Sequence, residues 1–114
     1  MKCELVRGPL DLMILSILRT EAAHGYAIIA ALSERSGGAF NMEAGTIYPA
    51  LHRLEQAGLV SSVWDAPDGR RRRRYSLTGE GQAALIGRET EWRRFGDSVD
   101  AVLGWSAQPM RRFR

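Results

Sequence analysis

The fold of this chain is decided by Gly45-Thr46-Ile47-Tyr48-Pro49-Ala50-Leu51-His52-Arg53-Leu54-Glu55, which Gly58-Leu59-Val60 follows. With ~100° of rotation per helical residue, the apolar residues of this stretch fall on one side of a helix. They are Ile47, Ala50, Leu51 and Leu54. The other side carries polar side chains, and Gly58 is suited to end the helix. The stretch therefore predicts a short amphipathic helix with a polar outer face.

Five consecutive arginines, Arg70 to Arg74, come soon after this helix. The segments Val60 to Trp64 and Arg72 to Leu77 contain strand-forming residues. Between them, Ala66-Pro67-Asp68-Gly69 is a turn sequence, because Pro fixes φ and Gly closes the turn. Side chains alternate along a strand, so only part of the arginine run meets one surface at a time. The segment predicts a cationic β-hairpin.

Two further helices precede this pair of elements. Pro9 opens an apolar segment that runs to Leu18, and Pro is favoured at the start of a helix. Gly25 begins a second helix, which Gly37-Gly38 ends. We expect Asn41 to cap the third helix, because an Asn side chain accepts hydrogen bonds from the free N–H groups of a helix start.

The last helix is predicted to be the longest element. Thr78 is a suitable N-cap, and the helical pattern continues to about Leu103. Large apolar residues recur along it with spacings of 7, 3, 4 and 3, which form an a/d-type seam. These residues are Leu85, Trp92, Phe95, Val99 and Val102. Because a small three-helix core leaves nothing to cover them, we expect them to form a homodimer interface.

The predicted fold class is mainly α with a small β-hairpin: a winged helix-turn-helix followed by a C-terminal dimerisation helix. We assign residues 1–78 to the winged helix-turn-helix, 79–104 to the dimerisation helix and 105–114 to a flexible basic tail. A helix that fits a major groove, beside a ribbon that grips phosphates, is typical of a protein that binds double-stranded DNA. The predicted DNA contacts are Thr46, Tyr48, Pro49, His52 and Arg53 on the helix, and Arg70, Arg71, Arg72 and Arg73 on the hairpin.

Less specific interpretations stay open. The alternative for the helix is an ordinary surface helix, in which Tyr48 and His52 pack over neighbouring residues. The alternative for the arginine run is a solvated surface segment that contacts no DNA. Asp65 and Asp68 flank the run and offset part of its positive charge. The main alternative function is a winged-helix module that binds another protein and never touches DNA. Exposed apolar residues on the outer face of the helix would favour that alternative.

Composition indicates a polyanionic partner and excludes several other classes. The net charge is +3, but residues 1–59 carry −1 and residues 60–114 carry +4. The longest apolar run, Leu12 to Leu18, is far shorter than the ~20 residues of a membrane span. The single cysteine, Cys3, favours a cytoplasmic protein. The sequence lacks HExxH, CxxC, GxSxG and phosphate-cradling Gly-rich motifs, so we expect no enzyme, no metal and no cofactor.

The combined pattern resembles the PadR family of bacterial transcriptional regulators. The resemblance rests on the stretch quoted first and extends upstream to Gly8–Leu18 and His24-Gly25-Tyr26. Downstream it includes Gly69–Arg73 and Tyr75–Thr78, so it covers nearly the whole chain. Arg74 departs from the pattern, because the family often has a second aromatic residue beside Tyr75.

The resemblance implies a homodimeric repressor that binds a pseudo-palindromic operator. The short last helix is similar to that of the small subfamily with a single dimerisation helix. In relatives of this build, a tryptophan at the position of Trp92 stacks on planar aromatic compounds. Trp92 and Phe95 are therefore candidate ligand-binding residues, with a planar aromatic molecule as the effector, and simple packing is the alternative role for the pair.

Overall fold

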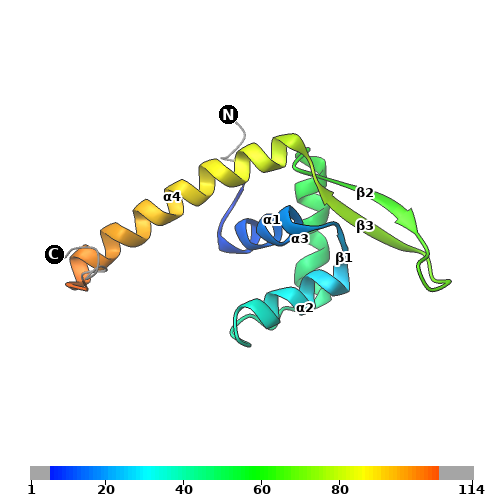
Figure 1. Ribbon diagram of the computed structural model, residues 1–114, viewed down its shortest axis with the longest axis horizontal. Helices are drawn as coiled ribbons and strands as arrows, with labels where there is room; N and C mark the ends of the chain where they lie inside the picture. The colour runs from blue at the N-terminus through cyan, green and yellow to red at the C-terminus, as the bar shows by residue number, and fades with distance from the viewer. Residues whose placement is uncertain (1–5, 106–114) are drawn as a thin grey trace.

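In a computed structural model of the chain, which describes residues 6–105, four helices and three strands are present. In chain order they are α1 (Pro9–Thr20), β1 (Ala23–His24), α2 (Gly25–Arg35), α3 (Ala44–Gln56), β2 (Val60–Asp65), β3 (Arg72–Leu77) and α4 (Gly79–Leu103). Figure 1 shows α4 running out from one side of the body, while the β2–β3 hairpin projects from the other side. The molecule is elongated, with principal extents of 56 × 33 × 22 Å.

The core lies where α1, α2, α3 and the first turns of α4 meet. The apolar side of α3 that the sequence predicts, from Ile47 to Leu54, is buried there. It packs with fully buried residues of the neighbouring helices, among them Ile14, Leu15 and Ile28. Burial of side chains of this size stabilises the fold by about 1.5–3 kcal/mol each. The α3 helix is therefore fixed by its inner face, and its outer face is free to carry polar residues.

The sheet contains a strand that the sequence does not predict. The two residues of β1 pair with β3 in antiparallel register, Ala23 opposite Tyr75 and His24 opposite Arg74. The strand order is β1-β3-β2, so β3 is central. In the predicted hairpin, Trp64 lies opposite Arg73. The β1 pairing joins the start of α2 to the hairpin and makes the hairpin part of the body.

The helix starts follow the predictions at one position and depart from them at another. The hydroxyl of Thr78 accepts a hydrogen bond of 2.9 Å from the N–H of Gly81, which confirms Thr78 as the cap of α4. The prediction that Asn41 caps α3 is wrong, because α3 begins at Ala44 with Glu43 in the N-cap position. The amide of Asn41 instead accepts from Ser33 and donates to a loop carbonyl, so it fixes the loop after α2.

The first turns of α4 pack closely against the base of the hairpin. A Cβ atom added at Gly81 would lie 2.0 Å from the carbonyl oxygen of Leu59, so only glycine fits there. One helical turn later, Leu85 is fully buried in the core of its own chain. The prediction of Leu85 as a dimer contact is therefore wrong, because this side chain has no surface left for a partner.

Two arginines hold α4 to the α1 region. Arg88 donates to the backbone carbonyl of Val6 through Nε and a terminal nitrogen. Arg19 of α1 donates to both carboxylate oxygens of Glu89, at 3.2 and 3.1 Å. The hydrogen bond from Arg19 lowers the pKa of Glu89, which keeps this carboxylate charged. Beyond these contacts α4 leaves the body.

The observed architecture is the predicted one, four helices with a small antiparallel sheet arranged as a winged helix-turn-helix. Within residues 6–105, no helix has both the length and the hydropathy that crossing a membrane requires. In the same part of the chain, no three His, Cys, Asp or Glu side chains gather into a metal-binding cluster. Of the predicted basic tail, only Trp105 belongs to the described residues.

Candidate nucleic-acid interface

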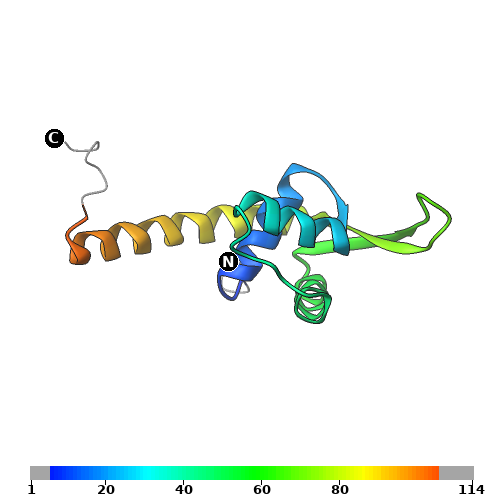
Figure 2. The ribbon, with the colours of Figure 1, turned by 90° about the horizontal axis from the view of Figure 1, so that it is seen from below.

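The α3 helix presents a small polar surface on the side opposite the core. Thr46, Pro49 and His52 are exposed along it. Figure 2 looks along α3 and shows it standing at one edge of the body, on the side from which the hairpin also extends. Pro49 lies beyond the first turn of the helix and cannot donate the helical hydrogen bond to the Gly45 carbonyl. This face has hydrogen-bonding groups and little side-chain bulk, as a groove-reading helix requires.

Tyr48 is half-buried rather than fully outward. A Cβ atom at Gly25 would lie 2.2 Å from the Tyr48 hydroxyl oxygen, so the tyrosine occupies the space that glycine leaves free. Tyr26 packs edge-on against the same ring, with centroids 6.2 Å apart. Burial raises the pKa of Tyr48, with Tyr26 also raising it and Arg72 lowering it. The phenol therefore remains a hydrogen-bond donor at neutral pH.

Arg53 binds within the protein. Its terminal nitrogens donate to the two carboxylate oxygens of Asp11 at 2.8 and 2.6 Å, in a bidentate pair. Asp11 is only 2% exposed and also accepts from the backbone N–H of Arg7. The hydrogen bond that Arg53 donates to Asp11 raises the pKa of Arg53. Arg53 was predicted to contact DNA, but its planar donor group is occupied by a buried carboxylate that has little other compensation.

The five arginines of the hairpin are not equivalent. Arg72 pairs with Asp68 at 2.7 Å, and Arg74 pairs with Asp65 at 3.0 Å. Asp68 and Asp65 therefore offset the charges of Arg72 and Arg74, as the sequence predicts. Arg73 reaches in another direction and is discussed below. Within residues 6–105, the side chains of Arg70 and Arg71 form no ion pair.

Two of the arginines lie against an indole ring. The guanidinium carbons of Arg71 and Arg73 are 4.5 and 5.0 Å from the ring centroid of Trp64. Arg73 also donates to the hydroxyl of Ser62 at 2.8 Å and lies 3.7 Å from Glu55 of α3. Ser62 in turn donates to Glu55 at 2.8 Å. A continuous set of contacts thus joins the end of α3 to the hairpin and its tryptophan.

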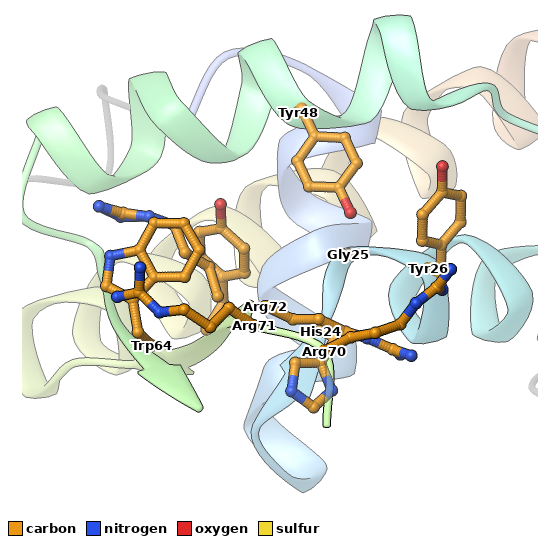
Figure 3. A pocket seen from close by; sticks show the side chains of 10 residues that line it. His24, Gly25, Tyr26, Tyr48, Trp64, Arg70, Arg71 and Arg72 are labelled. Carbon is orange, nitrogen blue, oxygen red and sulfur yellow. The ribbon is translucent and has the colours of Figure 1, made fainter. Parts of the chain in front are cut away.

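A groove of about 820 Å³ separates the hairpin from the helices. Figure 3 shows Tyr48 and Tyr26 on one side, Trp64 on another and arginine side chains along the edge between them. The Nε2 atom of His24, which also borders the groove, lies 2.7 Å from Asp65, the carboxylate that Arg74 also contacts. The hairpin is therefore tied to the body on both sides, through Glu55 and through His24.

The outer part of α4 carries a second exposed feature. Trp92, Phe95, Val99 and Val102 follow one side of the helix, with exposed fractions of 51%, 62%, 36% and 87%. The rings of Trp92 and Phe95 are in contact, with centroids 6.1 Å apart. They border a hollow of about 440 Å³ together with Leu12 of α1. This apolar stripe lacks a cover within residues 6–105.

A comparison with family models decides the family. Residues 14–86 match the transcriptional regulator PadR-like family. The chain belongs to the PadR family. A further comparison finds 40% identity over 91 residues with the transcriptional regulator Rv3488 of Mycobacterium tuberculosis, covering 80% of this chain and 78% of that protein. This PadR-family chain is accordingly a transcriptional regulator and not an enzyme.

Solved structures agree with this assignment. A PadR family transcriptional regulator from Eggerthella lenta is 39% identical with a TM-score of 0.76, covering 88% of this regulator and 86% of that chain. Bacillus subtilis PadR, solved in complex with operator DNA, has a TM-score of 0.63 at 26% identity. That match covers 68% of this regulator and 45% of the Bacillus chain. The winged helix-turn-helix is thus shared with a relative that was seen on DNA.

Sequence reasoning missed several residues that shape the α3 and hairpin surface of this PadR-family regulator. Tyr26 gave no signal of its own, because its contact with Tyr48 depends on how α2 packs on α3. Trp64 has no predicted role beyond its strand, although pairing the strands about the turn places it opposite Arg73. The role of Asp11 had no sequence signal, since its partner Arg53 lies 42 residues away.

Proposed function

We propose that this PadR-family regulator is a homodimeric repressor that binds a pseudo-palindromic DNA operator and is released by a planar aromatic ligand at the dimer interface. The observation that carries the proposal is the pairing of two exposed features on one chain. One is the polar α3 face beside the arginine-rich hairpin, and the other is the apolar stripe of α4. The first is suited to a polyanion, and the second to a copy of itself.

The dimer part of the proposal rests on the stripe of Trp92, Phe95, Val99 and Val102. Four large apolar residues along one helix face form a patch that monomeric proteins seldom leave open to water. Helix α4 carries this patch away from the body, where a second α4 has room to approach (Figure 1). A two-fold arrangement would bury the same stripe on both chains, which is the usual solution for a homodimer.

The DNA part rests on α3 and the hairpin. The exposed residues of α3 are small or polar, and large apolar side chains do not occur among them. That composition disfavours the alternative of a module that binds only protein. The operator complex of Bacillus subtilis PadR supports a DNA partner for a chain of this fold. A two-fold dimer would place its two α3 helices in major grooves about one helical turn, ~34–36 Å, apart.

His52 is expected to read a base. It is exposed on α3, one turn after Tyr48, and an imidazole either donates or accepts at a base edge. Replacing His52 by alanine should reduce the discrimination between operator and random DNA by about 1–3 kcal/mol. Fluorescence anisotropy titrations with both DNAs at one salt concentration measure this difference. Equal losses of affinity on both DNAs would show instead that His52 contacts only the backbone.

The ligand part rests on Trp92 and Phe95. The two rings are in contact beside a hollow that Leu12 also borders, and two copies of this pair would meet near a dimer axis. A flat aromatic compound stacks well on an exposed indole. Such a compound need not touch DNA to act. It favours release if it binds more tightly to a dimer whose α3 helices do not match the groove spacing.

Replacing the indole of Trp92 by a smaller ring is expected to weaken ligand binding. Planar cationic and phenolic aromatics should quench the tryptophan fluorescence of the wild type and weaken operator binding over the same concentration range. In Trp92→Phe both responses should weaken together, because the stacking surface is smaller. Trp105→Phe, which changes an exposed indole farther along the chain, is the matched control. Persistent quenching in Trp92→Phe would place the ligand elsewhere, and quenching without loss of DNA would deny it a regulatory role.

A further inference from the structure

Trp64 stands out because a large indole is half-exposed on a hairpin that is rich in arginine. It is 52% exposed, and two guanidinium groups lie within 5.0 Å of its ring centroid. A guanidinium over the face of a tryptophan is attracted by the ring quadrupole. The packing of Trp64 against cations is therefore favourable in itself, and it needs no burial in the core.

Stacking on the indole leaves the hydrogen-bond donors of the guanidinium available. The N–H donors of arginine point outward in the plane of the group, whereas the ring contacts its face. A stacked arginine thus keeps its donors for a phosphate while its position is held. A free arginine on a hairpin loses side-chain entropy when a phosphate fixes it. An arginine already held by Trp64 loses less, so it binds more tightly.

The two stacked arginines differ in what their donors do. Arg73 directs one terminal nitrogen to Ser62 and Glu55, so it is engaged with α3. Arg71 has no ion pair within the described residues. It also borders the groove beside α3 that Figure 3 shows. Among residues 6–105, Arg71 is therefore the stacked arginine whose donors have no partner, and Arg73 connects the indole to the recognition helix.

We propose that Trp64 is a positioning residue for DNA binding, which holds Arg71 ready for a backbone phosphate of the operator. The chain of contacts from Glu55 through Ser62 and Arg73 fixes the indole relative to α3. Arg71 then meets the phosphate at a set distance from the base edges that α3 reads. This inference rests on the proposed function, because it requires that the regulator bind DNA through α3 and the hairpin.

A double-mutant cycle tests the proposal. Arg71→Ala should weaken binding to operator and random DNA alike and lower the salt slope by about one unit. Trp64→Leu should weaken binding to both DNAs by several-fold, although it removes no charge. Combined, the two changes should cost little more than Arg71→Ala alone, because each removes the same held contact. Trp64→Phe, which keeps an aromatic face, should restore most of the affinity.

Matched controls separate positioning from general damage. Val63→Ala removes an exposed apolar side chain from the same strand and should leave DNA binding unchanged. Arg72→Ala, whose guanidinium pairs with Asp68 and not with the indole, should be additive with Trp64→Leu. In a Trp92→Phe, Trp105→Phe background, the fluorescence of Trp64 should change when operator binds, and this change should diminish in Arg71→Ala.

The outcomes are distinct. Additive effects of Trp64→Leu and Arg71→Ala, or failure of Trp64→Phe to restore affinity, would overturn the positioning role while DNA binding by the wild type still stood. A wild-type protein that binds neither its operator nor random DNA at low salt would overturn the proposed function, and this inference with it.

Discussion

Replacing Val99 and Val102 by glutamate is expected to convert the regulator into a monomer. Both residues lie on the exposed stripe of α4, and in a dimer the new carboxylates would be brought together in an apolar interface. A monomer reads one half-site only, so operator affinity should fall on the order of 10²-fold, the gain that a linked second contact provides. Sedimentation at micromolar protein and operator titrations measure the two effects.

Ala101→Glu is the matched control for this change. It adds a carboxylate to the same turns of α4, but on the side away from the stripe. The control protein should remain a dimer with wild-type affinity. A wild-type protein that sediments as a monomer would contradict the dimer directly. A double variant that stays dimeric would move the interface to another surface.

Loss of Arg53 is expected to destabilise the fold more than it harms base reading. Arg53→Ala would leave the carboxylate of Asp11 buried and, within residues 6–105, with only the backbone N–H of Arg7 as a partner. Removing one member of a buried ion pair costs about 3 kcal/mol, because the remaining charge is uncompensated. Urea unfolding at a fixed protein concentration measures this loss, and a fixed concentration matters because dimerisation contributes to stability.

Two variants distinguish this structural role from the predicted DNA contact. His52→Ala, on the exposed face of the same helix, should change the unfolding free energy by less than about 0.5 kcal/mol. The double variant Asp11→Leu, Arg53→Met should recover most of the stability, because it leaves no buried charge. If Arg53→Ala unfolds like the wild type but binds DNA weakly, the arginine serves the DNA and not the fold.

The elements of the fold that depend on local pattern could be predicted from the sequence. The inner face of α3 follows from the spacing of Ile47, Leu51 and Leu54, and the cap at Thr78 depends on one side chain and a nearby N–H. Asn41 shows the limit of this reasoning. Its side chain suits a helix cap and a loop equally well, and the contact with Ser33 decided for the loop.

The parts that depend on distant contacts could not be predicted. The pairing of β1 with β3 involves only two residues of β1, too few for any alternation to be visible. Leu85 belongs to a periodic apolar series, and periodicity does not tell whether a residue meets its own core or a second chain. The sequence left the partner of Arg53 undecided in the same way, because a hydrogen-bond donor on a helix face binds either a nucleic acid or a buried carboxylate.

The tight fit at Gly81 fixes the start of α4 against the body, so α4 acts as a spacer of constant length. Its 25 residues span ~38 Å, and the near end cannot slide past the Leu59 carbonyl. In the proposed dimer, the distance between the two α3 helices is then set by the position along α4 at which the apolar stripe begins. Inserting one residue between Arg88 and Trp92 would turn the stripe by ~100° and advance it by ~1.5 Å, and would reset the operator spacing that the protein accepts.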